Sequence, residues 1–340
     1  MQKLRRSLVI LAGVCLAASG VNVIAPASAR EPSPPRTKAA RKVAHGSALT
    51  AADVGPAAAG LAPKTLHPGG EMHDGRPVPF ARRIERSALY DGFRVAGPHL
   101  LIEQMHFYGP LDVYVTVPVV LRGVEIRPRK AADWALHTRP GAGPVYVLWS
   151  EMAAASTTGA PSSRAHALSR ALYLRSENVT VYRSHLTLAA DGIQIHAPGA
   201  RVVETLIDRL VYWAGDHNDG IQMLGKGADA QIVRSRIDNP NPQTSALNLI
   251  GDRVLIENCY LSGGGWTLYG GAHHTRRVPG STRGVVIRGN VFGRDHFPKG
   301  GNFGPVTGYD TVGPGNAWSS NRWSDGTPLV IGGPPAPRPR

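Results

Sequence analysis

Two carboxylates that recur at a fixed interval are the residues of this chain best suited to chemistry. The segment DGIQI (191–195) returns 28 residues later as DGIQM (219–223), which begins two residues after His217. Paired carboxylates can act as general acid and base when their surroundings separate their pKa values. An adjacent histidine could move a proton or orient one carboxylate. The candidate catalytic residues are therefore Asp219, His217 and Asp191.

Other interpretations of this constellation stay open. Asp-Gly can mark the turn before a strand, because Asp forms local hydrogen bonds and Gly permits a positive φ. We favour that interpretation for Asp191 and a functional role for Asp219. Asp216 and His196 lie close by in the sequence, and His196 is expected to be an ordinary surface residue. Ca²⁺ could bind among the carboxylate and amide oxygens, but no residue is assigned as a metal ligand.

An eight-residue template with apolar residues at positions 1, 3 and 8 surrounds both segments. Units of this kind bury their apolar side only by stacking on one another. The last five copies start 21, 30, 24 and 31 residues apart, enough for three short strands and their turns. The expected fold is all-β: a right-handed parallel β-helix (solenoid) with an irregular N-terminal lead-in and a C-terminal cap. The seven copies are LLIEQMHF (100–107), VVLRGVEI (119–126), VTVYRSHL (179–186), ARVVETLI (200–207), AQIVRSRI (230–237), VLIENCYL (254–261) and VVIRGNVF (285–292).

A second strand set aligns IQI (193–195), IQM (221–223), LNL (247–249) and, approximately, TLY (267–269). Alternation along a strand then predicts an outward row of amides. The segment 263–277 adds aromatic, histidine and arginine side chains that could stack on sugars or contact acidic groups, or it is simply a loop with a buried Trp. The candidate substrate-binding residues are Gln194, Gln222, Asn248, Lys226, Trp266, Tyr269, His273 and Arg276.

The ends of the 340-residue chain indicate export. Residues 1–29 read as a secretory signal, with a basic start, an apolar stretch and an A-x-A cleavage site. We expect a flexible or loosely docked Pro/Ala/basic lead-in over 30–65, a single β-helix domain over 66–330 and a disordered tail over 331–340. Cleavage of the signal leaves Cys259 as the only cysteine, which we interpret as a buried structural thiol rather than a nucleophile.

The net charge of +14 includes the signal and the lead-in, so the folded part is only moderately basic. We expect a polysaccharide partner, of which an anionic one suits this charge. The chain carries no nucleic-acid-binding module and no stable membrane anchor, and its sequence leaves the oligomeric state open. Lys226, Arg234, Arg236 and Arg253 are available as bases near the same coils, although surface positions would also explain them.

Three features resemble the pectate-lyase-like right-handed β-helix superfamily, in particular secreted actinobacterial proteins of poorly defined substrate. They are TAADVGPAAAGL (50–61) followed by YDGFRV (90–95), the V-x-I-x-x-x-x-I repeats, and GDHNDGIQMLG (215–225). The resemblance implies the fold, but that fold hosts lyases, hydrolases, epimerases, esterases and non-catalytic adhesins. The family's hydrolase series Asn-Thr-Asp, Asp-Asp, Gly-His-Gly and Arg-Ile-Lys is absent, and only NDG (218–220) is similar to part of it.

These observations together predict a secreted polysaccharide-degrading enzyme. The basic character favours β-elimination of an acidic, uronate-containing glycan. A glycoside hydrolase on the same fold is one alternative. A non-catalytic glycan- or cell-wall-binding protein is the other, in which the outward amides and aromatics bind and nothing reacts.

Overall fold

A computed structural model describes residues 44–155, 164–213, 217–224, 227–272 and 279–331, which belong to one unit spanning Arg36–Arg340. The expected signal (1–29), most of the expected tail (331–340) and part of the expected lead-in lie outside the described residues. In the described part of the chain, no helix is long and apolar enough to cross a membrane.

Three long sheets, here called sheets A, B and C, contain nearly all the regular structure. Sheet A consists of β1 (Thr65–His67), β7 (Met105–Phe107), β10 (Glu125–Ile126), β13 (Glu151–Ala153), β16 (His185–Thr187), β19 (Leu206–Asp208), β22 (Arg236–Asn239), β25 (Tyr260–Gly263), β28 (Val291–Phe292) and β31 (Arg322–Trp323). Sheet B consists of β2 (Gly70–Met72), β8 (Leu111–Val113), β11 (Leu136–Thr138), β14 (Arg170–Leu174), β17 (Asp191–Ile195), β20 (Asp219–Met223), β23 (Ser245–Leu249), β26 (Trp266–Gly270) and β29 (Gly304–Thr307). Sheet C consists of β3 (Arg82–Ile84), β6 (His99–Glu103), β9 (Val119–Arg122), β12 (Val145–Leu148), β15 (Thr180–Tyr182), β18 (Arg201–Val203), β21 (Gln231–Val233), β24 (Leu255–Glu257), β27 (Val286–Arg288) and β30 (Ala317–Ser319).

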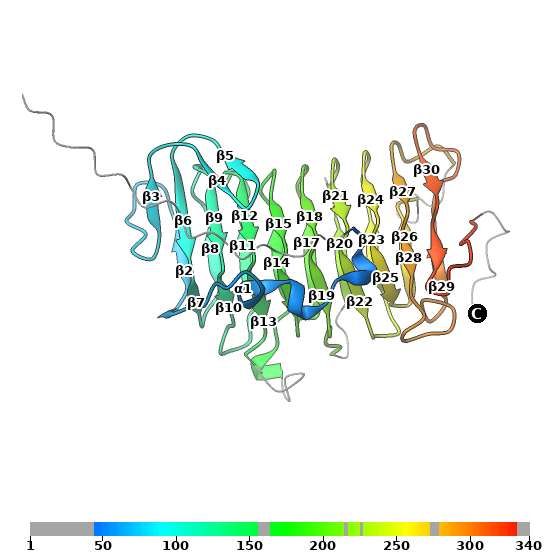
Figure 1. The fold of residues 1–340 in the computed structure, drawn as a ribbon, viewed down its shortest axis with the longest axis horizontal. Coiled ribbons are helices and arrows are strands. Elements are labelled where there is room, and N and C mark those ends of the chain that lie inside the picture. Colours follow the sequence, from blue (N-terminus) through cyan, green and yellow to red (C-terminus); the bar gives the residue numbers. More distant parts are fainter. Residues whose placement is uncertain (1–43, 156–163, 214–216, 225–226, 273–278, 332–340) are drawn as a thin grey trace, which may run out of the picture. The chain divides into compact units, whose positions relative to one another are not determined.

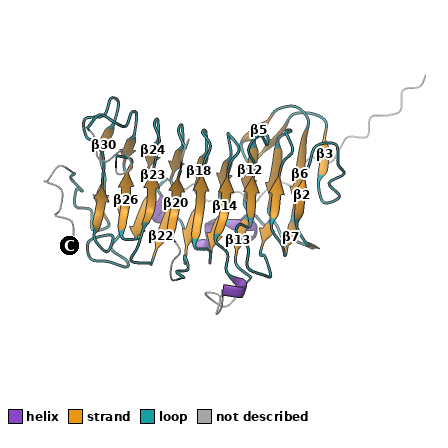
Figure 2. Ribbon diagram, turned by 180° about the vertical axis from the view of Figure 1, so that it is seen from behind, coloured by secondary structure: helices purple, strands orange, loops and turns teal. Residues whose placement is uncertain are grey.

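From β6 onward the chain visits sheets C, A and B in turn, so each circuit adds one strand to every sheet. Neighbouring strands within the three sheets pair in parallel, except β3, which pairs antiparallel with β6. The strands therefore stand side by side along the stack (Figures 1 and 2). A separate antiparallel hairpin, β4 (Ala88–Tyr90) and β5 (Phe93–Val95), packs Tyr90 and Val95 against residues of sheet C. The prediction of an all-β solenoid of parallel strands is confirmed.

The eight-residue template spans the corner between sheets C and A. Its fifth residue has a left-handed backbone in every copy, with φ between 46° and 65°, and this single residue turns the chain. Only two of the seven are glycine, so stacking between the coils holds five ordinary side chains in a conformation that L-residues seldom adopt. The seven residues are Gln104, Gly123, Arg183, Glu204, Arg234, Asn258 and Gly289.

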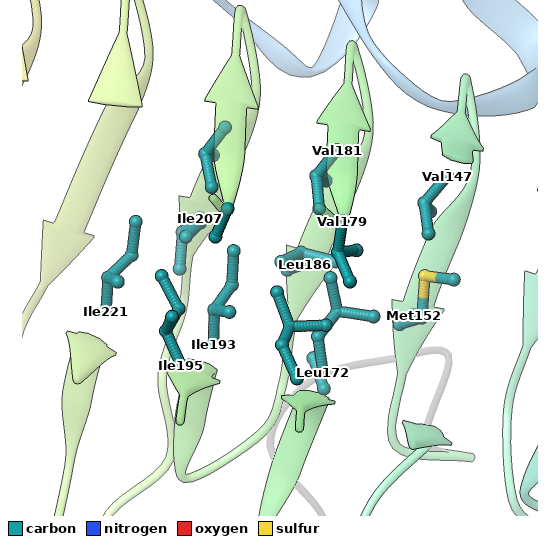
Figure 3. Close-up of a cluster of buried hydrophobic side chains, with 14 of the residues drawn as sticks. Val147, Met152, Leu172, Val179, Val181, Leu186, Ile193, Ile195, Ile207 and Ile221 are labelled. Atoms are coloured by element: carbon teal, nitrogen blue, oxygen red, sulfur yellow. The ribbon is translucent and has the colours of Figure 1, made fainter. Parts of the chain in front are cut away.

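Apolar side chains from all three sheets fill the interior of the stack. Leu172, Ile193 and Ile221 occupy the same register position on β14, β17 and β20, and each is fully buried (Figure 3). In such aligned columns, the apolar side chains of each coil are buried by stacking on the coils before and after it. Cys259 lies in this interior with no exposed surface, and burial raises the pKa of its thiol to about 12. The prediction of a buried thiol is confirmed.

The described part of the expected lead-in, residues 44–64, is docked on the solenoid rather than flexible. It contains two 3₁₀ turns, Gly46–Ala48 and Ala51–Asp53, and the short helix α1 (Gly55–Ala58). Its backbone donates to carbonyls of the left-handed corner residues: Gly46 to Asn258, and Gly55 to Arg183. The segment therefore runs back along the corner of successive coils, as the blue ribbon of Figure 1 shows. Hydrophobic periodicity could not reveal this segment, because it docks through backbone hydrogen bonds and a few unevenly spaced apolar side chains, Leu49, Val54 and Leu61, rather than through a repeating strand.

A buried histidine beneath this segment makes the stability of the fold dependent on pH. The Nε2 atom of His185 lies 2.9 Å from Asp208 Oδ1, and its Nδ1 atom lies 3.6 Å from Glu151 Oε2. Burial opposes the charge on the ring, but the two carboxylates prevail and raise the pKa of His185 from 6.5 to about 8. This stabilisation is fully present below pH 6.5 and is lost as the pH rises through about 8.

We expect the His185→Gln variant to lose this pH dependence. Urea unfolding of both proteins, below pH 6.5 and again above pH 8, gives the difference in unfolding free energy at each pH. The difference should shrink by about 2 kcal/mol at the higher pH, because a pKa unit corresponds to about 1.4 kcal/mol. A difference that stays constant across this range would contradict the assignment, since other titrating groups are common to both proteins.

Candidate active site

Asp191 and Asp219 are neighbours on the outer side of sheet B, where they begin strands β17 and β20. Ile193 and Gln194 pair with Ile221 and Gln222, which places the two carboxylates at the same register position. The backbone N–H of Asp219 donates to Asp191 Oδ1 over 2.8 Å. Both side chains are closed to solvent, with 4% of Asp191 and none of Asp219 exposed. The two aspartates, which are 28 residues apart in the sequence, are thus in direct contact.

The glycine after each aspartate is required by packing, not by a turn. Gly192 and Gly220 lie inside strands and do not have a positive φ. A Cβ atom on Gly192 would stand 2.4 Å from the carbonyl oxygen of Gly220 and 2.5 Å from Ile207 Cγ2. The interpretation of Asp191 as a turn residue is therefore wrong. The glycine allows the coils to approach closely at the point where the carboxylates meet.

Burial separates the pKa values of the two carboxylates. It raises the pKa of Asp191 to about 6, against the opposing effects of the Asp219 N–H, Gln194, Arg170 and His217. Burial and then the charge of Asp191 raise the pKa of Asp219 to about 8, against hydrogen bonding from Ser245 and the influence of Asn248. Two adjacent carboxylates resist simultaneous ionisation. At neutral pH the pair therefore holds one proton, on Asp219.

Of the two Asp219 oxygens, Oδ2 is the better placed to carry that proton. The hydroxyl of Ser245, on the next strand, donates to Oδ1. Oδ2 is buried and has no hydrogen-bond partner of ordinary geometry among the described residues. An orphaned oxygen on a fully buried carboxylate is costly unless it is protonated or meets a ligand.

The amide row forms in the predicted register, but its side chains are engaged and mostly covered. Gln194 Nε2 donates to Asp191 Oδ2 over 2.7 Å and to Gln222 Oε1 over 2.9 Å. Gln194, Gln222 and Asn248 are only 7%, 9% and 9% exposed. These amides hold the carboxylate pair in place, whereas the sequence had assigned them to substrate.

The amides belong to a longer row that follows sheet B strand by strand. Leu268 pairs with Leu247, one residue later than the expected alignment of TLY (267–269), so Tyr269 continues the row after Asn248. At the other end the row passes from Gln194 to Tyr173. The complete row is Glu71, Asp112, His137, Tyr173, Gln194, Gln222, Asn248, Tyr269 and Thr307.

Sequence reasoning missed the cationic and aromatic side chains on β14, beside the carboxylates. Arg170 pairs with Asp191 and donates to Gln194 Oε1 over 2.6 Å. The Tyr173 ring lies 4.5 Å from the ring of His137 and 5.1 Å from the guanidinium of Arg170. The sequence contains a signal for these residues. RALYLR (170–175) has the same spacing of polar residues as DGIQIH (191–196), which indicates a strand in the same register.

An aromatic surface lies on the opposite side of the pair. Trp266 and Tyr269 are half-buried residues of strand β26, which corrects the alternative of a loop with a buried Trp. The Trp266 ring is 6.3 Å from that of Phe303, which is 47% exposed. A Cβ atom on Gly304 would stand 2.6 Å from Trp266 Cζ3, so the indole lies against the backbone of β29. The exposed ring of Phe303, with the uncovered parts of Trp266 and Tyr269, suits stacking on sugar rings.

The remaining predicted site residues have different positions. His217 is exposed but within electrostatic reach of the pair, where its charge opposes the rise in the pKa of Asp191. His196 lies at the far end of β17, half-buried against Tyr173 at 5.0 Å, so it is neither an ordinary surface residue nor part of the carboxylate cluster. Asp216, Lys226, His273 and Arg276 lie outside the described residues.

The expected basic residues are paired elsewhere. Arg234 sits at the corner of sheets C and A, 3.0 Å from Glu204. Arg236 lies on sheet A over the ring of Tyr260, and Arg253 donates to Asp229 over 2.8 Å. None of the three is at the carboxylate pair, which corrects their proposed role as bases there.

No group of three or more His, Cys, Asp or Glu side chains that could hold a metal ion occurs among the described residues. In comparisons with known proteins, the chain matches no family model, no curated protein and no solved structure.

Proposed function

We propose that this protein is a secreted enzyme that cleaves a polysaccharide at the Asp191–Asp219 pair on the outer side of sheet B. One observation carries the proposal: Asp191 and Asp219 lie side by side and buried, with the Asp219 N–H donating to Asp191 Oδ1. Burial and the charge of Asp191 raise the pKa of Asp219 above that of Asp191, so a proton donor stands beside an ionised carboxylate. That is the division of roles that glycosidic cleavage requires. Right-handed winding and membership of the pectate-lyase-like superfamily are part of the same proposal.

The chemical step that we favour is hydrolysis. Asp219 gives its proton to the glycosidic oxygen as the bond to the anomeric carbon breaks. Neighbouring strands lie about 4.8 Å apart, which is closer to the carboxyl separation of about 5–5.5 Å in retaining glycosidases than to the wider spacing of inverting ones. Asp191 then forms the covalent glycosyl intermediate. Water displaces it, and Asp219 takes the proton of that water.

Elimination, which the sequence favoured, is the second chemical route. It needs cationic side chains to neutralise the carboxylate of a uronate while a base removes the neighbouring proton. Arg234, Arg236 and Arg253 are paired with carboxylates away from the site. Arg170 is the described arginine at the pair, and it is bonded to Gln194. Hydrolysis therefore requires fewer rearrangements than elimination.

Glycan binding without cleavage is the second candidate function, because the pair is closed to solvent whereas aromatic surface flanks it. If the protein is an enzyme, the side chains of Gln194, Gln222 and Asn248 must move away from Asp219 when a sugar binds. A binding protein would use Trp266, Tyr269 and Phe303 alone and leave the carboxylates covered.

A screen of the exported protein against acidic and neutral polysaccharides separates these functions. We expect new reducing ends without the ultraviolet absorbance of an unsaturated uronate, together with retention of configuration at the anomeric carbon by nuclear magnetic resonance. A rise in both reducing ends and absorbance would establish elimination instead. Retained binding with no product from any glycan would establish the binding protein and refute the enzyme.

A further inference from the structure

Arg170 holds the side-chain amide of Gln194 in one orientation. The Nε atom of Arg170 donates to Gln194 Oε1 over 2.6 Å. The Nε2 atom of Gln194 donates to Asp191 Oδ2 over 2.7 Å and to Gln222 Oε1 over 2.9 Å. If the amide were turned by a half rotation, its oxygen would face the carboxylate of Asp191 and its protons would face the guanidinium of Arg170. These contacts therefore favour the observed orientation and oppose the other.

Arg170 is itself held at the start of β14, next to the carboxylate pair. Its backbone lies at the same register position as that of Asp191. Its guanidinium lies 5.1 Å from the centre of the Tyr173 ring, and its Nη1 atom donates to the carbonyl oxygen of Asp133 over 3.4 Å. In the part of the chain that the structure describes, its partners are thus an amide, a ring and a backbone carbonyl. None of these neutralises its charge, which remains available to act on Asp191.

The hydrogen bonds of the two carboxylates differ. Both oxygens of Asp191 accept from N–H groups, Oδ1 from the backbone of Asp219 and Oδ2 from Gln194. The Oδ1 atom of Asp219 accepts from the Ser245 hydroxyl, whereas its Oδ2 atom has no partner of ordinary geometry among the described residues. Donors to a carboxylate stabilise its ionised form. The Gln194 amide is therefore one of the two donors that direct the proton of the pair away from Asp191.

Three charged groups lie around Asp191: Arg170 on β14, Asp219 on β20 and His217 before β20. Burial raises the pKa of Asp191, and the charges of Arg170 and His217 oppose that rise. His217 is exposed, so solvent and salt screen its charge. Arg170 is half-buried and is also bonded to the amide that donates to Asp191. Arg170 therefore has two ways to stabilise the ionised form, one of them through Gln194.

We propose that Arg170 is a positioning residue: it holds the Gln194 amide with its NH₂ group toward Asp191, which keeps Asp191 ionised and leaves the proton of the pair on Asp219 until a sugar displaces the amides. Without Arg170 the amide can turn, and its oxygen can then accept a hydrogen bond from a protonated Asp191. The proton would pass from Asp219 to Asp191, and the pair would lose its acid. The inference concerns the acid and the nucleophile of the proposed function and to that extent rests on it, but the position of the proton can be measured without a substrate.

Carbon-13 nuclear magnetic resonance of protein labelled at the aspartate carboxyl carbons follows the two titrations directly. The Asp191→Asn and Asp219→Asn variants identify the two signals. In the parent protein, Asp191 should lose its proton at a lower pH than Asp219. In Arg170→Met the titration midpoint of Asp191 should rise by about one pH unit, because a tenfold change in protonation is typical for the loss of one charge-assisted donor. Arg170→Lys keeps a charged donor and should return the midpoint most of the way to the parent value.

The matched control is Arg175→Met. Arg175 follows the last residue of the same strand, is exposed, and has its guanidinium 5.7 Å from the same Tyr173 ring. Its removal takes away one positive charge from β14 but leaves the Gln194 amide and its bond to Arg170 intact. The midpoint of Asp191 should therefore stay at the parent value in Arg175→Met. An equal shift in Arg170→Met and Arg175→Met would mean that net charge alone moves the titration, and would overturn the positioning role.

A double-mutant cycle tests whether Arg170 acts through Gln194. Gln194→Met removes the donor to Asp191 while Arg170 stays in place, so it should raise the Asp191 midpoint whether or not Arg170→Met folds. In the Gln194→Met background, Arg170→Met or Arg170→Lys should add little, because the amide that Arg170 orients is gone. Equal shifts from the Arg170 substitution in both backgrounds would show that its charge acts directly. An unmoved Asp191 midpoint in Gln194→Met would likewise overturn the inference.

The pH profile of cleavage separates this inference from the proposed enzyme. The acidic limb of kcat/KM reports the free enzyme, and in Arg170→Met it should move up by about one pH unit, as the Asp191 signal does. A shift of Asp191 that depends on Gln194, in a protein that cleaves no glycan, would sustain the role of Arg170 in placing the proton and refute the enzyme. Cleavage with the same pH profile in Arg170→Met and the parent protein would sustain the enzyme and refute the role of Arg170.

Discussion

Replacing Asp219 by Asn is expected to abolish cleavage and at the same time to stabilise the protein. The variant keeps the shape of the side chain but cannot protonate the leaving group, which should lower kcat by about 100- to 10,000-fold. The same carboxyl is fully buried beside Asp191, with a pKa raised to about 8. A buried carboxyl beside another carboxylate lowers the stability of the fold. Such a loss of stability is common at functional sites and rare at structural ones.

The pH dependence of this stabilisation has a definite sign. The unfolded chain releases the proton of Asp219 near pH 3.8 and the folded protein only near pH 8, so the folded state binds more protons between these values. The unfolding free energy of the parent protein therefore falls as the pH rises through this window. Asp219→Asn should remove that fall and be the more stable protein at pH 8 by several kcal/mol.

Chemical denaturation across this range, together with an assay of released reducing ends, checks both parts of the prediction. The control is Asp325→Asn, which alters an exposed carboxylate bonded to Arg294 and Thr327. It should retain activity and change stability little. A destabilised Asp219→Asn variant would mean that the ionised carboxylate supports the fold, and the proposed acid would then be a structural residue.

Replacing Gly220 by Ala should strongly destabilise the protein. The new Cβ would stand 2.3 Å from Ile237 Cγ2 and 2.4 Å from the carbonyl oxygen of Ala246. The second of these is backbone of the next coil, so relief requires the strands themselves to move. We expect a loss of about 3 kcal/mol in unfolding free energy, at the upper end for overpacked cores. Cleavage should also fall, because Asp219 would shift against Asp191.

The matched control for Gly220→Ala is Gly227→Ala. A Cβ atom there would first meet the flexible end of Met223, at 3.2 Å, and its backbone φ is not positive. Urea unfolding midpoints of the two variants should differ clearly, with Gly227→Ala close to the parent protein. Similar midpoints for both would show that the coils at the carboxylate pair are not as closely packed as the structure places them.

The spacing of apolar residues is enough to determine the solenoid. Every copy of the eight-residue template forms a strand of sheet C and a strand of sheet A, and the DGIQ copies form neighbouring strands of sheet B. Stacking interactions are local and repeat from coil to coil, so a periodic sequence carries them directly. The same spacing brought Asp191 and Asp219 to one register position and placed Cys259 in the interior.

Only the tertiary structure determines the burial, the hydrogen bonds and the pKa values of those residues. The pKa values of the carboxylates depend on burial and on each other's charge, which no local pattern encodes. The amides of Gln194 and Gln222 point outward as alternation predicts, yet hydrogen bonds with Asp191 and with each other occupy them. Docking of residues 44–64 arises from contacts with coils distant in sequence. Periodicity determines which residues stack, whereas solvent exclusion and charge, which depend on everything around a site, determine their chemistry.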